Sequence, residues 1–270
     1  MVMSPVVRSG RAALGTDCAG DGRPVVFLHA GVADRRMWRH QVSVSSGSYR
    51  AIAYDRRGFG STAPVDEGFS QVGDLLAVLD QLAGAEVEPA ALVGCSQGGR
   101  IAIDAALSRP DRVRSLVLVA PAVSGAPPEP AFSATIQAIL DELAAAEAAA
   151  DLERVNALEA RIWLDGPLSP ESRVAGAPRE LFLDMNGIAL RAPQLGVEEE
   201  PAPAYDRLHE IRVPTLVIVG DLDFPHLQAR CRHIAATIPG ARLHVLEQTA
   251  HLPSLEQPER VSALIEGFVA

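Results

Sequence analysis

Short apolar runs recur along the chain and alternate with segments that have helical spacing. Each run is rich in β-branched residues and is bounded by Gly, Pro or Asp, which is typical of a strand. The runs are almost continuously apolar, so both faces of each strand are expected to be buried, as in a parallel sheet. We predict such strands at residues 24–28, 51–54, 90–93, 115–119 and 215–219, and a further strand-like run at 243–246. Helices are predicted at residues 72–82, 99–107, 227–238 and 258–269.

This alternation predicts an α/β fold, a doubly wound and mostly parallel sheet with helices on both faces. Residues 6–16 are expected to add a hairpin at one edge. The regular pattern stops near residue 122 and resumes near residue 205. We therefore predict a core made of residues 1–121 and 206–270, with a helical cap inserted at 122–205.

Local signals within the predicted cap indicate three helices. Two apolar faces with helical spacing begin near Phe132 and Leu152. Ser169-Pro170-Glu171 predicts the start of a further helix, because Ser is a good N-cap, Pro fits the first helical position and an acid suits the helix dipole. The acidic run 198–200 before Pro201 is interpreted as a solvated linker back to the core.

Composition narrows the function classes. The chain has 270 residues, 48% of them hydrophobic and 21% charged, as in an ordinary globular protein with a large core. Its formal net charge of −10 argues against non-specific binding to nucleic acids or to anionic membranes. All 24 basic residues are arginine. The lack of lysine excludes Schiff-base enzymes and phosphate-binding Gly-Lys-Ser/Thr loops.

Cysteine usage and hydropathy point to a reduced compartment. Cys18, Cys95 and Cys231 form no C-x-x-C pair, so neither a disulfide framework nor a metal site is expected. No apolar run approaches the ~18 residues of a membrane span, and the first ten residues do not resemble a signal peptide. We expect a cytoplasmic protein that needs no cofactor.

The segment 94–98, Gly-Cys-Ser-Gln-Gly, is the most informative motif. It follows an apolar run and precedes a helix-like stretch, which is the arrangement of a serine nucleophile on a sharp strand-to-helix turn. Gly94 and Gly98 leave room for the crowded backbone. Ser96 is thus the candidate nucleophile, and the amide of Gln97 at the helix start is a candidate oxyanion donor. Cys95 is expected to point into the core.

A serine nucleophile needs a base and an acid that orients the base, in the chain order Ser, acid, His. His251 lies in a polar loop after the predicted strand 243–246, at the edge of the sheet where ligands bind in open α/β folds. Asp223 follows the predicted strand 215–219 and is the favoured acid. Asp221 is the other candidate and is expected to cap the turn.

The second oxyanion donor is expected from the loop after the first predicted parallel strand. Gly31 is the first choice there and Val32 the second. His29 lies in the same loop, but it precedes the nucleophile along the chain. We therefore expect it to brace the loop rather than to act as the base.

Taken together, these motifs make the chain similar to the α/β-hydrolase family. The resemblance runs from about residue 24 to the C-terminus, with its motifs in the family's order. One departure is Ala30, where the family usually has glycine. The motifs are Leu-His-Ala-Gly at 28–31, Tyr-Asp-Arg-Arg-Gly-Phe-Gly-Ser at 54–61, the turn 94–98, the segment 213–223 and the segment 250–259.

The resemblance implies nucleophilic acyl transfer. His251 would take the proton of Ser96, Asp223 would hold the imidazole, and the amides of Gln97 and Gly31 would bind the oxyanion. Serine at the nucleophile position argues against the haloalkane dehalogenase and epoxide hydrolase branches, which use aspartate. Carboxylic ester or lactone hydrolysis is the first hypothesis. The alternatives are a C–C bond hydrolase, a thioesterase or a cofactor-free perhydrolase with the same triad, or a non-enzymatic ligand receptor.

The predicted cap should enclose an apolar pocket. We therefore expect a small, uncharged and largely apolar ester-type substrate, and no nucleic-acid or membrane partner. Ordinary packing is the alternative role for each candidate pocket residue. These candidates are His29, Trp38, Phe132, Ile136, Trp163, Phe182, Met185 and Leu252.

Overall fold

The computed structural model describes residues 2–83, 88–129, 131–193 and 196–270. Within these residues, eight strands form one sheet in the order β1-β2-β4-β3-β5-β6-β7-β8. All neighbours from β4 to β8 are parallel, while β1 and β2 form the predicted antiparallel hairpin at one edge. The strands are β1 Val6–Ser9, β2 Ala12–Ala19, β3 Pro24–Leu28, β4 Arg50–Tyr54, β5 Ala90–Cys95, β6 Val113–Val119, β7 Thr215–Gly220 and β8 Arg242–Leu246.

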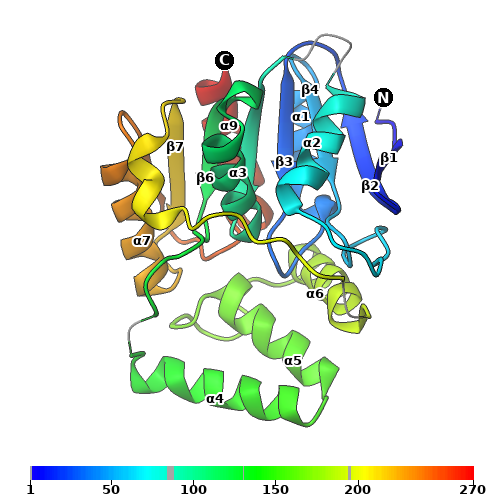
Figure 1. Ribbon diagram of the computed structural model, residues 1–270. Coiled ribbons are helices and arrows are strands. Elements are labelled where there is room, and N and C mark those ends of the chain that lie inside the picture. Colours follow the sequence, from blue (N-terminus) through cyan, green and yellow to red (C-terminus); the bar gives the residue numbers. More distant parts are fainter. Residues whose placement is uncertain (1, 84–87, 130, 194–195) are drawn as a thin grey trace.

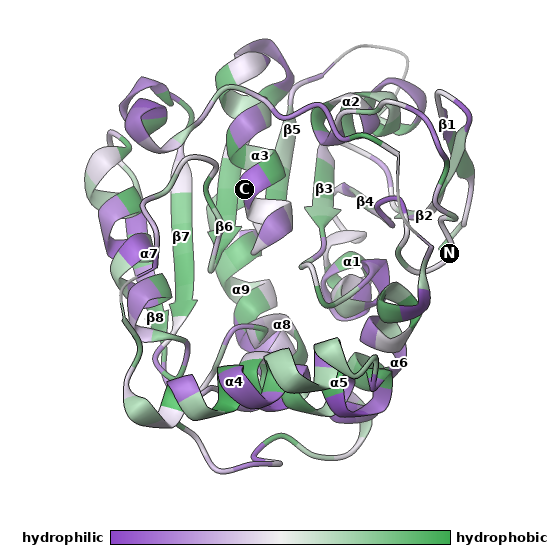
Figure 2. Ribbon diagram, turned by 60° about the horizontal axis from the view of Figure 1, so that its bottom comes forward, coloured by the Kyte–Doolittle hydropathy of each residue, from purple (hydrophilic) through white to green (hydrophobic). Residues whose placement is uncertain are grey.

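Helices cover both faces of the sheet, as predicted for a doubly wound fold (Figure 1). On one face, α2, α3 and α7 pack on the strands, and on the other face lie α1, α8 and α9. Figure 2 shows hydrophobic residues along β3, β6 and β7, whereas helices such as α1 and α7 also carry hydrophilic surface. These helices are α1 Arg39–Ser45, α2 Gln71–Leu82, α3 Gln97–Ser108, α7 Pro225–Thr237, α8 Pro253–Glu256 and α9 Pro258–Val269. Short helical turns are η1 Arg35–Trp38, η2 Pro110–Arg112 and η4 Tyr205–Glu210.

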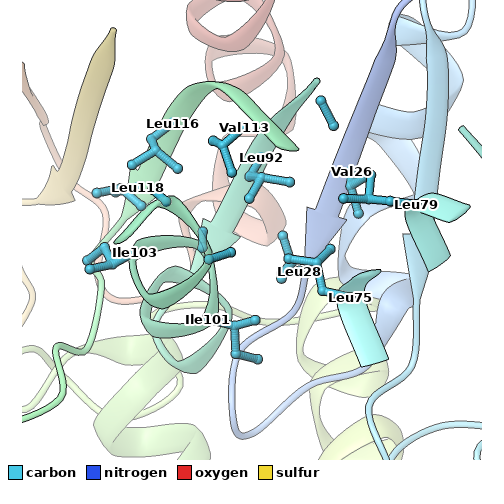
Figure 3. Packing of buried hydrophobic residues seen from close by; sticks show 14 of the residues in the cluster. Val26, Leu28, Leu75, Leu79, Leu92, Ile101, Ile103, Val113, Leu116 and Leu118 are labelled. Atoms are coloured by element: carbon cyan, nitrogen blue, oxygen red, sulfur yellow. The ribbon is translucent and has the colours of Figure 1, made fainter. Parts of the chain in front are cut away.

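Two buried clusters, one on each face, hold the core together. Every residue of β3 and β5 is buried, so alternate side chains of one strand enter opposite clusters. Val26 and Leu28 pack with Leu92 and with helices α2 and α3, as Figure 3 shows. Phe27 enters the cluster on the other face. This two-sided burial explains why the sequence shows continuous apolar runs.

A helical segment follows β6 and returns to the sheet at β7. Its helices lie beneath the carboxyl ends of the parallel strands in Figure 1. Ile139 and Leu158 form a small core with Phe224 and Leu227, which attaches the segment to α7. We call this segment the helical insertion. Its elements are α4 Ala134–Ala148, α5 Leu152–Glu159, the π-helix η3 Ala160–Asp165 and α6 Ala177–Arg191.

These helices fall inside the predicted range 122–205, and the division into core and cap domains stays a prediction. The structure describes no helix among residues 2–83, 88–129, 131–193 and 196–270 that is long and apolar enough to cross a membrane.

The predicted helix start at Ser169-Pro170-Glu171 was wrong, because residues 166–176 form a loop and α6 begins at Ala177. The buried carboxylate of Asp165 accepts the backbone N–H groups of Ser172 at 2.8 Å and Val174 at 3.0 Å. Ser172 also has a left-handed φ of 60°. A tertiary contact to a buried acid therefore overrides the local capping signal.

The acidic linker is anchored rather than freely solvated. Arg100 of α3 forms ion pairs with Glu198 at 2.5 Å and with Glu200 at 2.9 Å. Gln71 at the start of α2 also donates to Glu198 at 3.2 Å. The return segment is thereby held against helices of the core.

Candidate active site

Ser96 stands between the last residue of β5 and the first residue of α3. Its backbone has φ 50° and ψ −114°, a conformation that a non-glycine residue rarely adopts. The Ser96 N–H donates to the carbonyl of Val119 at 2.9 Å, and its own carbonyl accepts from Ala122 at 3.0 Å. The end of β6 therefore holds the strained serine in place.

Two glycines make this turn sterically feasible. A Cβ atom on Gly94 would lie 2.3 Å from the carbonyl oxygen of Gly98. A Cβ atom on Gly98 would lie 2.2 Å from the carbonyl oxygen of Leu28. Because these obstacles are backbone atoms, larger residues would force the strand, the turn and the helix apart. The Gly-x-Ser-x-Gly spacing is thus a packing requirement of the turn.

His251 and Asp223 meet at the same edge of the sheet, from the loops that follow β8 and β7. Nδ1 of His251 lies 2.8 Å from Oδ2 of Asp223, and both residues are 3% exposed. Oδ1 of Asp223 accepts the N–H of Phe224 at 2.8 Å. With its Nδ1 proton held by the carboxylate, the imidazole has Nε2 available as a base. The side chain of Asp221 is exposed.

Ser96 and His251 line one cavity of about 350 Å³. Among the described residues, no hydrogen bond joins the Ser96 hydroxyl to the imidazole. Such contacts are often long without substrate and shorten when it binds. The structure thus brings the three predicted triad residues to one site through a shared cavity and one direct contact.

The helical insertion contacts the imidazole directly. The ring of Trp163, in η3, lies 4.7 Å from that of His251 between centroids. The backbone N–H of His251 donates to the carbonyl of Trp163 at 3.2 Å. Below the loop, the buried Cys95 thiol contacts the carbonyl oxygen of His251 at 3.6 Å, so Cys95 lies in the core as predicted.

Backbone N–H groups are available near the serine. Gly31, Val32 and Gln97 line the same cavity as Ser96. Within the described part of the chain, none of these three amides has a hydrogen-bond acceptor. An oxyanion formed at Ser96 would find donors there. The choice between Gly31 and Val32 stays a prediction.

His29 braces the loop that carries the amides of Gly31 and Val32. Its Nε2 accepts the backbone N–H of Arg56 at 3.0 Å, and its Nδ1 donates to the carbonyl of Ala30 at 2.8 Å. Complete burial lowers the pKa of His29 well below its usual value, so the ring is neutral. This hydrogen-bonding pattern agrees with the bracing role expected from the sequence.

A sequence model of the alpha/beta hydrolase family matches residues 25–264. The chain belongs to this family. A 2-hydroxymuconate semialdehyde hydrolase from Pseudomonas sp. (strain CF600) is 31% identical over 274 residues, which cover 93% of this chain and 88% of that protein. A pimeloyl-acyl-carrier protein methyl ester esterase from Aeromonas hydrophila is 26% identical over 93% of this chain and 96% of its own length. The solved structure of an N-acyl homoserine lactone degrading enzyme has a TM-score of 0.74 at 27% identity, covering 98% of this chain and 100% of its own.

The sequence analysis did not predict half of the described residues that line the cavity of this alpha/beta hydrolase. Ala120 and Ala122 were identifiable in principle, because they follow a parallel strand adjacent to β5. The charged residues have no comparable local signal. The residues missed are Ala120, Ala122, Glu129, Glu159, Leu227 and Arg230.

Of the predicted pocket residues, Trp163 lines the cavity and the others lie elsewhere in the described structure. Phe132 and Ile136 line a separate cavity of about 180 Å³. His29 braces its loop, as described above. The remaining four are buried in the core cluster that also contains residues of α9, and α6, which carries two of them, packs against η1. These four are Trp38, Phe182, Met185 and Leu252.

Proposed function

We propose that this alpha/beta hydrolase cleaves a carboxylic ester or lactone through an acyl-enzyme on Ser96. The observation that carries the proposal is the strained Ser96 in one cavity with His251, whose Nδ1 is held 2.8 Å from Asp223. A nucleophile on a sharp turn and an oriented base are the two requirements of acyl transfer by serine.

The chemistry assigns one role to each group. Oγ of Ser96 attacks the carbonyl carbon while Nε2 of His251 takes the hydroxyl proton. The amides of Gln97 and of Gly31 or Val32 stabilise the oxyanion, each contributing a few kcal/mol to transition-state binding. His251 then gives its proton to the departing alkoxide. Water, deprotonated by His251, cleaves the acyl-enzyme, releases the acid and restores Ser96.

The cavity sets the scale of the substrate in this proposal. A volume of about 350 Å³ suits a small or medium ester. The helical insertion acts as the cap, because Trp163 is part of the cavity wall beside His251. Glu129, Glu159 and Arg230 make part of this wall polar, so the bound molecule carries polar groups besides the ester.

Hydrolysis of a C–C bond by the same groups is the second candidate. The observation that favours it is the 31% identity to a 2-hydroxymuconate semialdehyde hydrolase across 93% of the chain. Parallel assays on esters and on a vinylogous β-diketone separate the two candidates. Ester hydrolysis as the native reaction requires the higher kcat/KM on an ester or lactone.

Labelling with a fluorophosphonate probe tests the nucleophile, and a screen of p-nitrophenyl esters and lactones tests the reaction. We expect labelling at Ser96 and turnover of p-nitrophenyl butyrate, with both lost in Ser96→Ala. Folded protein that is neither labelled nor active would overturn the hydrolase mechanism. Tight ligand binding with negligible turnover would instead indicate a receptor.

A further inference from the structure

One wall of the cavity carries a carboxylate that the proposed acyl transfer does not use. Glu159 is the last residue of α5, and the π-helical turn η3 begins directly after it. Such turns are rare and frequently occur at functional sites. Here η3 places Trp163 against His251, while Glu159 lines the same cavity one turn earlier. Glu159 therefore belongs to the wall of the space in which a substrate would bind.

Both asparagines of the chain, Asn156 and Asn186, are used to hold this carboxylate. Nδ2 of Asn186 donates to Oε2 of Glu159 at 2.5 Å and to Oδ1 of Asn156 at 3.0 Å. Asn156 in turn donates to the carbonyl of Leu183 at 2.8 Å. Asn186 is 2% exposed, so this network is part of the interior of the insertion.

No positive charge neutralises Glu159 among the described residues. Its carboxylate forms no ion pair within 4.0 Å, although Arg230 lines the same cavity. Oε1 has no hydrogen-bond donor in the described part of the chain, whereas Oε2 has Asn186. Burial raises the pKa of Glu159, although the hydrogen bond from Asn186 opposes this shift. One acceptor atom is thus left for a ligand.

We propose that Glu159 determines substrate specificity by accepting a hydrogen bond from an uncharged N–H group, such as a secondary amide, on the ester or lactone. The inference rests on the proposed function, because it takes the reaction at Ser96 from it. The binding at Glu159 does not depend on that reaction. Asn186 already shows an amide N–H bound to the other oxygen of the same carboxylate. The wall also holds Arg230 and a second carboxylate, Glu129, and the contact from Asn186 is the observation that favours a neutral amide donor.

The experiment compares esters that differ only in an N–H or a CH₂ group. One pair is the p-nitrophenyl esters of N-acetyl-β-alanine and of 5-oxohexanoic acid. A second pair, from N-acetyl-4-aminobutyric acid and 6-oxoheptanoic acid, moves the amide one carbon further from the ester. We expect the wild type to prefer the amide in kcat/KM by at least about tenfold at one spacing, which is typical of a hydrogen bond to a charged group.

Variants of Glu159 test whether its carboxylate causes the preference for the amide ester. Glu159→Leu is expected to bring the ratio within about twofold of one, whereas Glu159→Gln keeps an acceptor oxygen and part of the preference. The matched control is Glu153→Leu, an exposed residue in the first turn of the same helix, which should leave the ratio unchanged. Circular dichroism and thermal melting establish that each variant is folded. An unchanged ratio in folded Glu159→Leu, or a wild-type ratio near one at both spacings, would overturn the inference.

Binding to the Ser96→Ala variant separates this inference from the proposed function. Calorimetry on that variant should give a Kd for the amide ester at least about tenfold lower than for its ketone partner. If the wild type hydrolyses neither ester but this difference persists and disappears with Glu159→Leu, the inference holds and the proposed function fails. Equal rates and equal Kd values within each pair would leave the hydrolase standing and remove the role of Glu159.

Discussion

The backbone N–H of His251 donates to the carbonyl oxygen of Trp163 at 3.2 Å, and the two rings pack with centroids 4.7 Å apart. This contact joins the loop that carries the proposed base to the helical insertion. The orientation of the imidazole therefore depends on two separate supports: Asp223 at Nδ1 and the ring of Trp163. Each support has a distinct experimental signature.

Replacement of Trp163 tests the support from the insertion. Trp163→Ala removes the ring and keeps the backbone hydrogen bond, so the imidazole loses packing while its loop stays in place. We expect kcat/KM on p-nitrophenyl butyrate to fall by roughly tenfold to a hundredfold, the range caused by small misplacements of catalytic groups. Trp163→Phe keeps an aromatic ring, so its kcat/KM should fall less.

The control is Trp38→Phe, which changes the chain's other tryptophan in the core. That variant should lose mainly stability in urea unfolding. Equal kcat/KM values for Trp163→Ala and the wild type would contradict a role for this ring in positioning His251.

Separate replacement of Asp223 and of the nearby Asp221 tests the support at Nδ1 of His251. Asp223→Asn removes the charge beside Nδ1 and permits the wrong imidazole tautomer, so kcat should fall by about 10⁴-fold, the effect known for Ser-His-Asp triads. Asp221→Asn changes an exposed side chain and should retain most activity. Steady-state kinetics on one ester measures both variants. The reverse ranking would mean that Asp221 is the functional acid.

The strands, and the meeting of the three candidate triad residues at one edge of the sheet, were predictable because their signals are local and ordered along the chain. Completely buried strands such as β3 and β5 appear as continuous apolar runs. Asp223 follows the completely buried strand β7, and His251 follows β8, a partly exposed strand at the edge of the sheet. Parallel strands bring their carboxyl ends to one edge. No long-range information was needed to place Ser96 with them.

The cavity wall was not predictable in the same way. Phe182 and Met185 have the helical spacing of pocket residues, yet α6 uses them to pack on the core. Glu159 gains its setting from Asn186, which is 27 residues away. Likewise, the buried Asp165 organises the loop after η3 against the capping signal at Ser169. The docking of the insertion decides these roles, and no local pattern encodes it.

Gly94→Ala tests the packing requirement of the turn. The new methyl carbon would lie 2.3 Å from the backbone oxygen of Gly98, so β5 and α3 must separate and Ser96 must move. We expect kcat/KM to fall by at least about a hundredfold. The free energy of unfolding should fall by about 1 to 3 kcal/mol, as is typical of overpacking.

Gly267→Ala is the matched control, because nothing lies within 4 Å of a Cβ atom there and the residue belongs to α9. This variant should gain about 0.5–1 kcal/mol in urea unfolding without a change in rate. A Gly94→Ala enzyme with wild-type activity would show that the turn tolerates a side chain.

Asp104, a residue of α3 that is 4% exposed, should make the stability of the protein depend on pH. Burial raises its pKa to about 6, although the hydroxyl of Ser124 donates to it at 3.0 Å. An unfolded aspartate has a pKa of about 3.9. Between these values the folded chain binds more protons than the unfolded chain, so this carboxyl lowers stability as the pH rises from 4 to above 6.

Asp104→Asn removes this pH-dependent loss, since the amide stays neutral and still accepts from Ser124. In urea unfolding at pH 7.5, the free energy of unfolding of the variant should exceed that of the wild type by roughly 1 to 3 kcal/mol, and the difference should vanish near pH 4. Asp206→Asn, at an exposed aspartate, is the control for the substitution itself. The difference in free energy of unfolding between Asp104→Asn and the wild type could instead be the same at pH 4 and pH 7.5. That result would mean that the buried carboxyl titrates alike in the folded and unfolded chains.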